Sequence, residues 1–324
     1  MFSELPKLFD RNFAIAYFLP VSIFLAISAW LLDRVGYWAN ISAQLTSDNA
    51  LINATLGVLI AWIGGILLMV LNRDIYRFLE GYGRFNPLRW FENRAKAEYT
   101  KKDERLNWLN DEYSKPTFTA NLRKERTELL EEMAQRYPDQ VDFVLPTAFG
   151  NALRAFEVYP RVMYGFESIE GWSRILAVLP KEYRELIDDA KSQVDWWVNL
   201  GTLSLVLVIE FWVVVFRKWG FTPAWYYTVL NIVIPIIIFG LLNWFMQWRA
   251  TSAVVGWGDY IKSAFDIYRF TLLESLGIDA PKTRAEEKAL WTKFSQATLF
   301  RLPYVLPELK KPESKPKPKK PKPK

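Results

Sequence analysis

The stretch WWVNLGTLSLVLVIEFWVVVF, residues 196–216, decides the fold class. It is long and apolar enough to cross the hydrocarbon core of a bilayer, which takes about 20 residues as an α-helix. Three further windows share this property, at residues 13–32, 51–71 and 225–246, and Glu210 is the only charged residue in the four. Tryptophan gathers at the window ends, where an amphipathic ring suits the membrane interface. The sequence therefore predicts four transmembrane helices.

Composition excludes several classes of function. The chain has 324 residues and a formal charge of +6, but residues 308–324 alone hold eight Lys and two Glu, so the rest is neutral. A basic groove for nucleic acid is therefore not indicated. Cys and His are absent, which excludes thiol nucleophiles, Cys/His zinc sites and Ser-His-Asp arrangements. We find no nucleotide-binding loop and expect no cofactor, although chemistry by Asp and Glu remains open.

Arginine placement predicts the orientation. Several arginines follow the second window closely, whereas residues 33–50, between the first two windows, contain only Arg34. By the positive-inside rule, the N-terminus, the long middle segment and the C-terminus are cytoplasmic. Arg217 and Lys218, on the expected outside, count against this orientation.

Proline, glycine and capping residues along the chain predict the helices outside the windows. A helical hairpin is expected before Pro138, and a helix that starts after Pro180 should run without a break into the third window. After the fourth window, an amphipathic helix should stop near Gly277, and a capping box at Thr283 and Glu286 should open another helix. The Lys/Pro-rich end cannot bury a core, so we expect it to be disordered and extended.

Polar residues inside the last two windows are candidate functional residues. With a turn near residues 220 and 221, Glu210 lies level with Asn231, and Asn199 lies level with Asn243. We expect Glu210 to face the bundle interior and to bond with Asn231. A polar latch between helices is favoured over an ion or proton site, and both remain open.

A second candidate site lies in the middle segment. Asn151, Arg154 and Glu157 are spaced three residues apart on one helix, and Tyr159 and Tyr164 follow. One interpretation is a solvated face with an Arg154–Glu157 ion pair. The other is a docking or ligand surface, since Arg and Tyr are common interface residues.

Three stretches carry a resemblance: LPTAFGNALRAFEVYPRVMYGFESIEGW, RNFAIAYFLP and WGDYIKSAFDIYRFTLLESLG. In them the chain resembles a group of uncharacterised bacterial four-span membrane proteins. The resemblance implies a bacterial plasma membrane and brings no activity or site with it.

The predicted fold is an all-α polytopic membrane protein with four transmembrane helices in two hairpins and an inserted helical cytoplasmic domain. The segments expected are residues 1–72 and 196–248 for the hairpins, 73–195 for the domain, 249–306 for the amphipathic segment and 307–324 for the tail. The leading function is a non-enzymatic membrane scaffold or sensor that binds protein partners, or anionic lipid through its tail. The alternative is a homo-oligomeric channel or transport component that uses Glu210.

Overall fold

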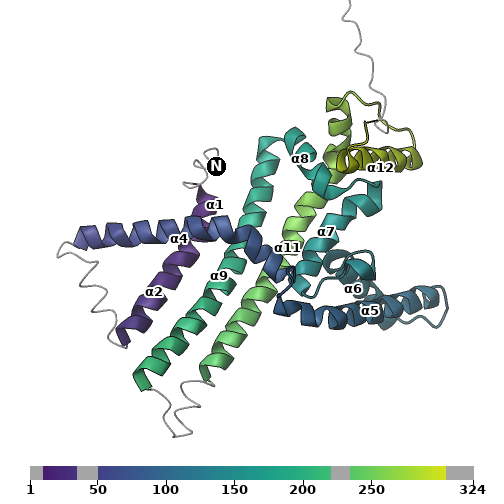
Figure 1. Cartoon of the computed structure of the whole chain (residues 1–324). Helices are drawn as coiled ribbons and strands as arrows, with labels where there is room; N and C mark the ends of the chain where they lie inside the picture. The colour runs from purple at the N-terminus through teal and green to yellow at the C-terminus, as the bar shows by residue number, and fades with distance from the viewer. Residues whose placement is uncertain (1–9, 35–49, 220–233, 304–324) are drawn as a thin grey trace, which may run out of the picture. The chain divides into compact units, whose positions relative to one another are not determined.

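The structure is a computed structural model that describes residues 10–34, 50–219 and 234–303 (Figure 1). These ranges are helical and contain no β-strand, so the predicted all-α class is confirmed. Three helical stretches in them are long and apolar enough to cross a membrane: Arg11–Asp33, Leu51–Leu79 and Lys181–Val214. The fourth predicted window lies partly outside the described residues.

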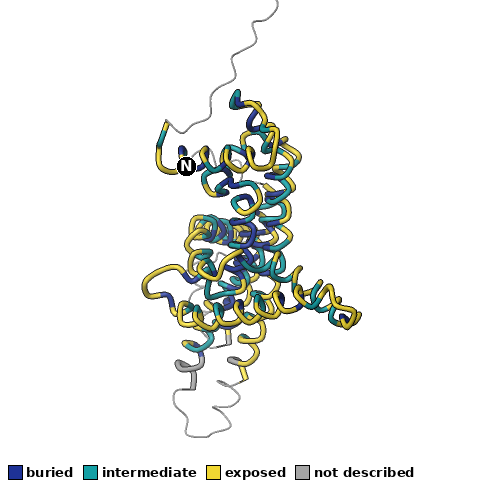
Figure 2. Tube along the Cα trace, turned by 90° about the vertical axis from the view of Figure 1, so that its right-hand side faces the viewer, coloured by how far each residue is buried: buried dark blue, intermediate teal, exposed yellow. Residues whose placement is uncertain are grey.

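The apolar helices leave much of their surface uncovered (Figure 2). Only 17% of the most apolar window of the second candidate span is buried within the chain. Its exposed residues Leu59, Ile63, Leu67 and Val70 recur at helical spacing and form one stripe. A soluble protein rarely exposes a continuous apolar stripe of this kind, and the stripe is compatible with a membrane protein.

The described chain divides into two compact units. The first consists of Met1–Phe156 and Glu185–Tyr260, and the second of Glu157–Arg184 and Ile261–Lys324. Three helices contribute residues to both: α7 (Ala148–Tyr164), α9 (Lys181–Trp219) and α11 (Ile234–Ser275).

The first helical stretch of unit 1 contains a π-helical segment close to a proline. It comprises α1 (Arg11–Phe13), the π-helical η2 (Ala14–Phe18) and α2 (Leu19–Arg34). Pro20 has no N–H, so it cannot donate to the carbonyl of Ala16 four residues earlier. Asn199 of α9, fully buried, donates its side-chain N–H to that carbonyl at 2.7 Å. A polar residue of the third window therefore satisfies the backbone of the first.

The second helix, α4 (Ala50–Leu79), packs against the first through two glycines. A Cβ on Gly64 would lie 2.8 Å from a methyl carbon of Val21, and one on Gly65 would lie 3.3 Å from the backbone nitrogen of Phe18. Small residues let the two backbones approach closely. Just after the helix, Gly81 has a φ of 90°, which allows the Tyr82 N–H to reach back to the Arg77 carbonyl.

The predicted helical hairpin is present as α5 (Glu92–Glu112) and α6 (Ala120–Arg136), after the short η3 (Pro87–Phe91). Lys102 of α5 joins the two helices, since its ammonium bonds both Glu98 and Glu132 at 2.8 Å. Burial alone would lower the pKa of Lys102, but these bonds outweigh it and raise that pKa. The Lys102 hydrogen bond lowers the pKa of Glu98, so this pair stabilises α5 at neutral pH and loses that contribution as acid protonates Glu98.

The long helices run further than the sequence windows suggested. α9 is one helix of 39 residues, which confirms the predicted continuous passage from Pro180 into the third window. α11 is one helix of 42 residues, so the described end of the fourth window and the amphipathic stretch after it are not separated near residue 248. Trp197 of α9 packs edge-on against Phe245 of α11, with ring centroids 5.9 Å apart.

Unit 2 has an aromatic core between α8 (Ser168–Val178), α12 (Arg284–Phe300) and the later part of α11. The rings of Phe166 and Trp291 stack at 4.1 Å, and Phe265 meets Phe166 edge-on. The predicted capping box opens α12, since the Glu286 N–H donates to the Thr283 hydroxyl at 3.2 Å. The Glu286 carboxylate accepts from the N–H of Lys282 rather than that of Thr283.

The bond between Asn199 and Ala16 gives a prediction about stability. Asn199→Leu should lower the free energy of unfolding by about 1–2 kcal/mol, because it leaves a buried carbonyl unsatisfied. In a Pro20→Ala background the helix regains its own donor for that carbonyl, so the same substitution should cost clearly less. Thermal unfolding of the four variants in detergent measures the coupling. Equal costs in both backgrounds would refute the assignment.

Candidate functional site

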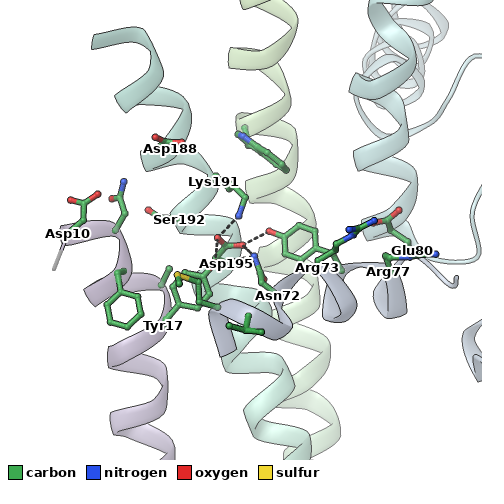
Figure 3. Close-up of a pocket in the computed structure, with 17 residues that line it drawn as sticks. Asp10, Tyr17, Asn72, Arg73, Arg77, Glu80, Asp188, Lys191, Ser192 and Asp195 are labelled. Carbon is green, nitrogen blue, oxygen red and sulfur yellow. Dashed lines mark hydrogen bonds and ion pairs between the residues drawn. The ribbon is translucent and has the colours of Figure 1, made fainter. Parts of the chain in front are cut away.

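A buried carboxylate joins three helices of unit 1. Asp195, only 3% exposed, accepts hydrogen bonds from four side chains. The donors and their distances are Tyr17 at 2.8 Å, Asn72 at 3.1 Å, Tyr76 at 2.7 Å and Lys191 at 2.7 Å. We call these five residues the Asp195 cluster (Figure 3). Asn72 also donates to the Tyr17 hydroxyl at 3.0 Å, so the donors are bonded to one another as well.

Local sequence explains why these side chains meet. Asn72 and Tyr76 lie one helical turn apart on α4, directly after the apolar window that ends at Leu71. Lys191 and Asp195 lie one turn apart on α9, directly before the apolar window that begins at Trp196. Each pair therefore lies where an apolar helix becomes polar. The Asp195 carboxyl group can be buried at such a level because charged and neutral donors surround it.

A pocket of about 560 Å³ opens beside the cluster within unit 1. Its apolar wall includes Phe13, Ala16, Met69 and Val70. Its polar wall adds charged residues to the cluster, namely Asp10, Arg73, Arg77, Glu80 and Asp188 (Figure 3). The pocket therefore combines apolar surface with charges of both signs.

Glu210 lies elsewhere along α9 and has its own partner. The hydroxyl of Ser28 on α2 donates to its carboxylate at 2.6 Å, and Glu210 is half-buried. Asn231, the partner expected from the sequence, lies outside the described residues. The contact with Ser28 is the arrangement that a latch between helices requires, although Ser28 was not singled out by the sequence.

Two other asparagines of the predicted windows, Asn199 and Asn243, bond backbone carbonyls. Asn199 donates to Ala16, as described above. Asn243 of α11 donates to the carbonyl of Gly201 at 3.1 Å, two residues along α9 from Asn199. Both side chains act as links between helices, and neither is among the donors to Asp195.

The residues of the second candidate site have different partners and do not form one cluster. Asn151 is buried and exchanges two hydrogen bonds with the backbone of Leu145, and Arg154 donates to the Tyr82 hydroxyl. Glu157 is half-buried in unit 2.

Tyr159 and Tyr164 lie together in unit 2. Both hydroxyls donate to the Asp266 carboxylate, at 3.1 and 2.6 Å. Burial and the bond to Asp266 raise the pKa of Tyr164. These tyrosine hydroxyls hold α7 to α11 within the unit, and a docking role for the surface around them stays a prediction.

The Asp195 cluster was missed by sequence reasoning. Asp195 lies one residue outside the apolar window, so a search for charges inside the windows passes over it. The available signal was the set of polar residues directly flanking the windows, which includes Asn72, Lys191 and Asp195.

The described residues contain no group of three or more acidic side chains that could hold a metal ion. Comparisons with family models, curated proteins and solved structures found no match for the chain.

The hydrogen bonds of the cluster predict that substitution of Asp195 strongly lowers the stability of the protein. Asp195→Ala should destabilise the protein by about 3 kcal/mol, because it removes four hydrogen bonds and leaves the Lys191 ammonium unpaired. The exposed Glu182 on the same helix serves as the matched control, and Glu182→Gln should have almost no effect. Thermal unfolding in detergent compares the two. In a Lys191→Met background the cost of Asp195→Ala should shrink, and a cost that stays the same would show that the two residues are not coupled.

The Ser28 contact gives a test of the latch at Glu210. Glu210→Gln keeps an oxygen that can accept from Ser28, so stability and assembly should change by less than about 0.5 kcal/mol. Glu210→Leu removes the acceptor and should be destabilising. The same unfolding measurement compares both. A strong loss of activity or assembly in Glu210→Gln would contradict the latch and favour a titrating site.

Proposed function

We propose that the chain is a non-enzymatic integral membrane scaffold or sensor of a bacterial plasma membrane. Four spans hold it in the bilayer with both termini in the cytoplasm, and its polar helices bind protein partners or a second copy of the chain. The observation that carries the proposal is the continuous α9, which passes without a break from polar sequence, through the Asp195 cluster, into an apolar window.

The continuity of α9 supports a sensing role. A helix is stiff over this length, so a displacement of one end also moves the other end. The Asp195 cluster ties α9 to η2 and α4 at the level where the sequence becomes polar. A molecule that changes the hydrogen bonds of this cluster would therefore change how η2 and α4 hold the polar part of α9.

Exposed aromatic residues after α4 support contact with a membrane surface. Phe85 and Trp90 are 91% and 85% exposed, higher than the other large apolar residues in the described chain. Arg84 and Arg89 stand directly before them in sequence. Aromatic rings beside arginines suit the headgroup region of a bilayer. This segment would hold the α5–α6 hairpin close to the membrane.

The basic tail belongs to the same proposal, although residues 308–324 lie outside the described residues. Its six net positive charges would attract anionic lipid, at about 1 kcal/mol per charge near the surface. The tail would then be a second contact between the polar part of the chain and the membrane.

The alternative function is a homo-oligomeric channel or transport component, and one observation favours it. Glu210 is a carboxyl group inside a candidate span, a position where ionisable residues often mark a transport path. Its bond to Ser28 is also what a purely structural latch would show. Reconstitution into vesicles separates the two, because a channel must give an ion flux that Glu210→Gln changes.

The orientation and the anchoring role are tested together by labelling. Because the chain has no Cys, the single substitutions Ser42→Cys and Ser114→Cys each introduce one thiol and give a clean readout. A membrane-impermeant maleimide added to intact cells should label the Ser42→Cys variant, whereas the Ser114→Cys variant should react only after the membrane is opened. Labelling at position 114 from outside, with position 42 protected, would overturn the orientation and with it the cytoplasmic role of the α5–α6 hairpin.

A further inference from the structure

The pocket beside the Asp195 cluster contains an unusual share of unpaired polar atoms. Six buried side-chain atoms lack a hydrogen-bond partner in the described part of the chain, and three of them belong to residues that line this pocket. They are the side-chain oxygens of Asn12 and Asn72 and the indole nitrogen of Trp257. An unpaired buried group costs about 1–3 kcal/mol, so such groups are few in folded proteins. The pocket therefore matches a ligand that both donates and accepts hydrogen bonds.

Arg73 and Arg77 provide a place for an anion on the α4 wall. They lie one helical turn apart on α4, and both line the pocket (Figure 3). Lys191 of the same pocket is paired with Asp195. Two guanidinium groups can hold the oxygens of one phosphate with directed hydrogen bonds. The indole N–H of Trp257 is a further donor on the same pocket.

The overall charge of the pocket disfavours a ligand with only negative charge. Its lining carries four carboxylates, of Asp10, Glu80, Asp188 and Asp195, against the three cations Arg73, Arg77 and Lys191. A phosphate that also carries an ammonium group adds no net negative charge. A primary ammonium has three N–H donors, which the unpaired oxygens of Asn12 and Asn72 can accept. A zwitterion with a primary amine fits both requirements.

The level of the pocket along the helices indicates where such a zwitterion would come from. Met69 and Val70, from the end of the apolar window of α4, line the pocket together with Asn72 and Arg73. This change from apolar to polar sequence marks the headgroup region when the helix spans a bilayer. A lipid headgroup reaches this level by lateral diffusion, with its acyl chains against the apolar surface.

We propose that the pocket binds the headgroup of a phospholipid that carries a primary ammonium, as phosphatidylethanolamine does. The phosphate lies against Arg73 and Arg77, and the ammonium donates to the oxygen of Asn72, next to Arg73 in the chain. The bound lipid thereby contacts the Asp195 cluster through Asn72, and it is the signal that the scaffold or sensor reads. This inference rests on the membrane placement in the proposed function.

Lipid-dependent thermal unfolding of the purified full chain in detergent tests the proposal. Added phosphatidylethanolamine should raise the unfolding midpoint at concentrations about tenfold lower than phosphatidylcholine, whose trimethylated amine has no N–H donor. The double variant Arg73→Gln/Arg77→Gln should weaken the response by about tenfold or more. Trp257→Phe, which keeps an aromatic ring but removes the N–H, should weaken it less.

The matched control is Arg94→Gln/Arg123→Gln, which removes two exposed arginines of α5 and α6 outside the pocket. It should respond to phosphatidylethanolamine like the unaltered chain. An equal response to both lipids, or an equal loss in the control, would overturn the proposal. Soluble phosphoethanolamine acting at the same concentration as the lipid would assign the pocket to a free zwitterion instead. Because the protein is in detergent, failure here leaves the cysteine labelling of the orientation unaffected.

Discussion

Unit 1 depends on the hydrogen bonds that converge on the carboxylate of Asp195. Each oxygen accepts from two side chains, so the acceptor capacity of the carboxylate is filled by residues of η2, α4 and α9. Apolar packing between helices is tolerant of sliding and rotation, especially in lipid, where tails are as apolar as leucine. Directed hydrogen bonds to one buried carboxylate do not tolerate such sliding or rotation. The cluster therefore fixes the register of three helices that apolar contacts alone would leave less defined.

Glu210 and Asp195 show two ways in which one helix carries a carboxylate. Glu210 has one described neutral donor, Ser28, and lies inside the apolar stretch. Asp195 has a charged donor and three neutral ones, and lies at the end of that stretch. The carboxylate in the more polar sequence therefore has more donors, and one of them is charged. A pocket opens beside the second carboxylate, where polar and apolar surfaces meet, so the candidate site lies there.

The helices were largely predictable from the sequence, and the site was not. Hydropathy over about 20 residues identifies apolar helices, and Gly277, Pro180 and the Thr283 capping box mark helix ends, because these signals act over a few neighbouring residues. The Asp195 cluster joins residues separated by up to 178 positions. Nothing near Tyr17 indicates that its hydroxyl meets Asp195. The role of Asn199 was equally hidden, since its acceptor depends on a proline in another helix.

The carbonyl of Ala16 has a consequence for how the protein is made. Its donor, Asn199, is encoded 183 residues later. At a synthesis rate of about 5–20 residues per second, the first helix waits on the order of 10–40 seconds before that donor leaves the ribosome. If the first helix enters a bilayer during this interval, it carries a backbone carbonyl that neither Pro20 nor lipid can satisfy. In a membrane, the hydrogen bonding of the N-terminal helix would then be complete only after α9 has been made, because its last donor, Asn199, lies in the second half of the chain.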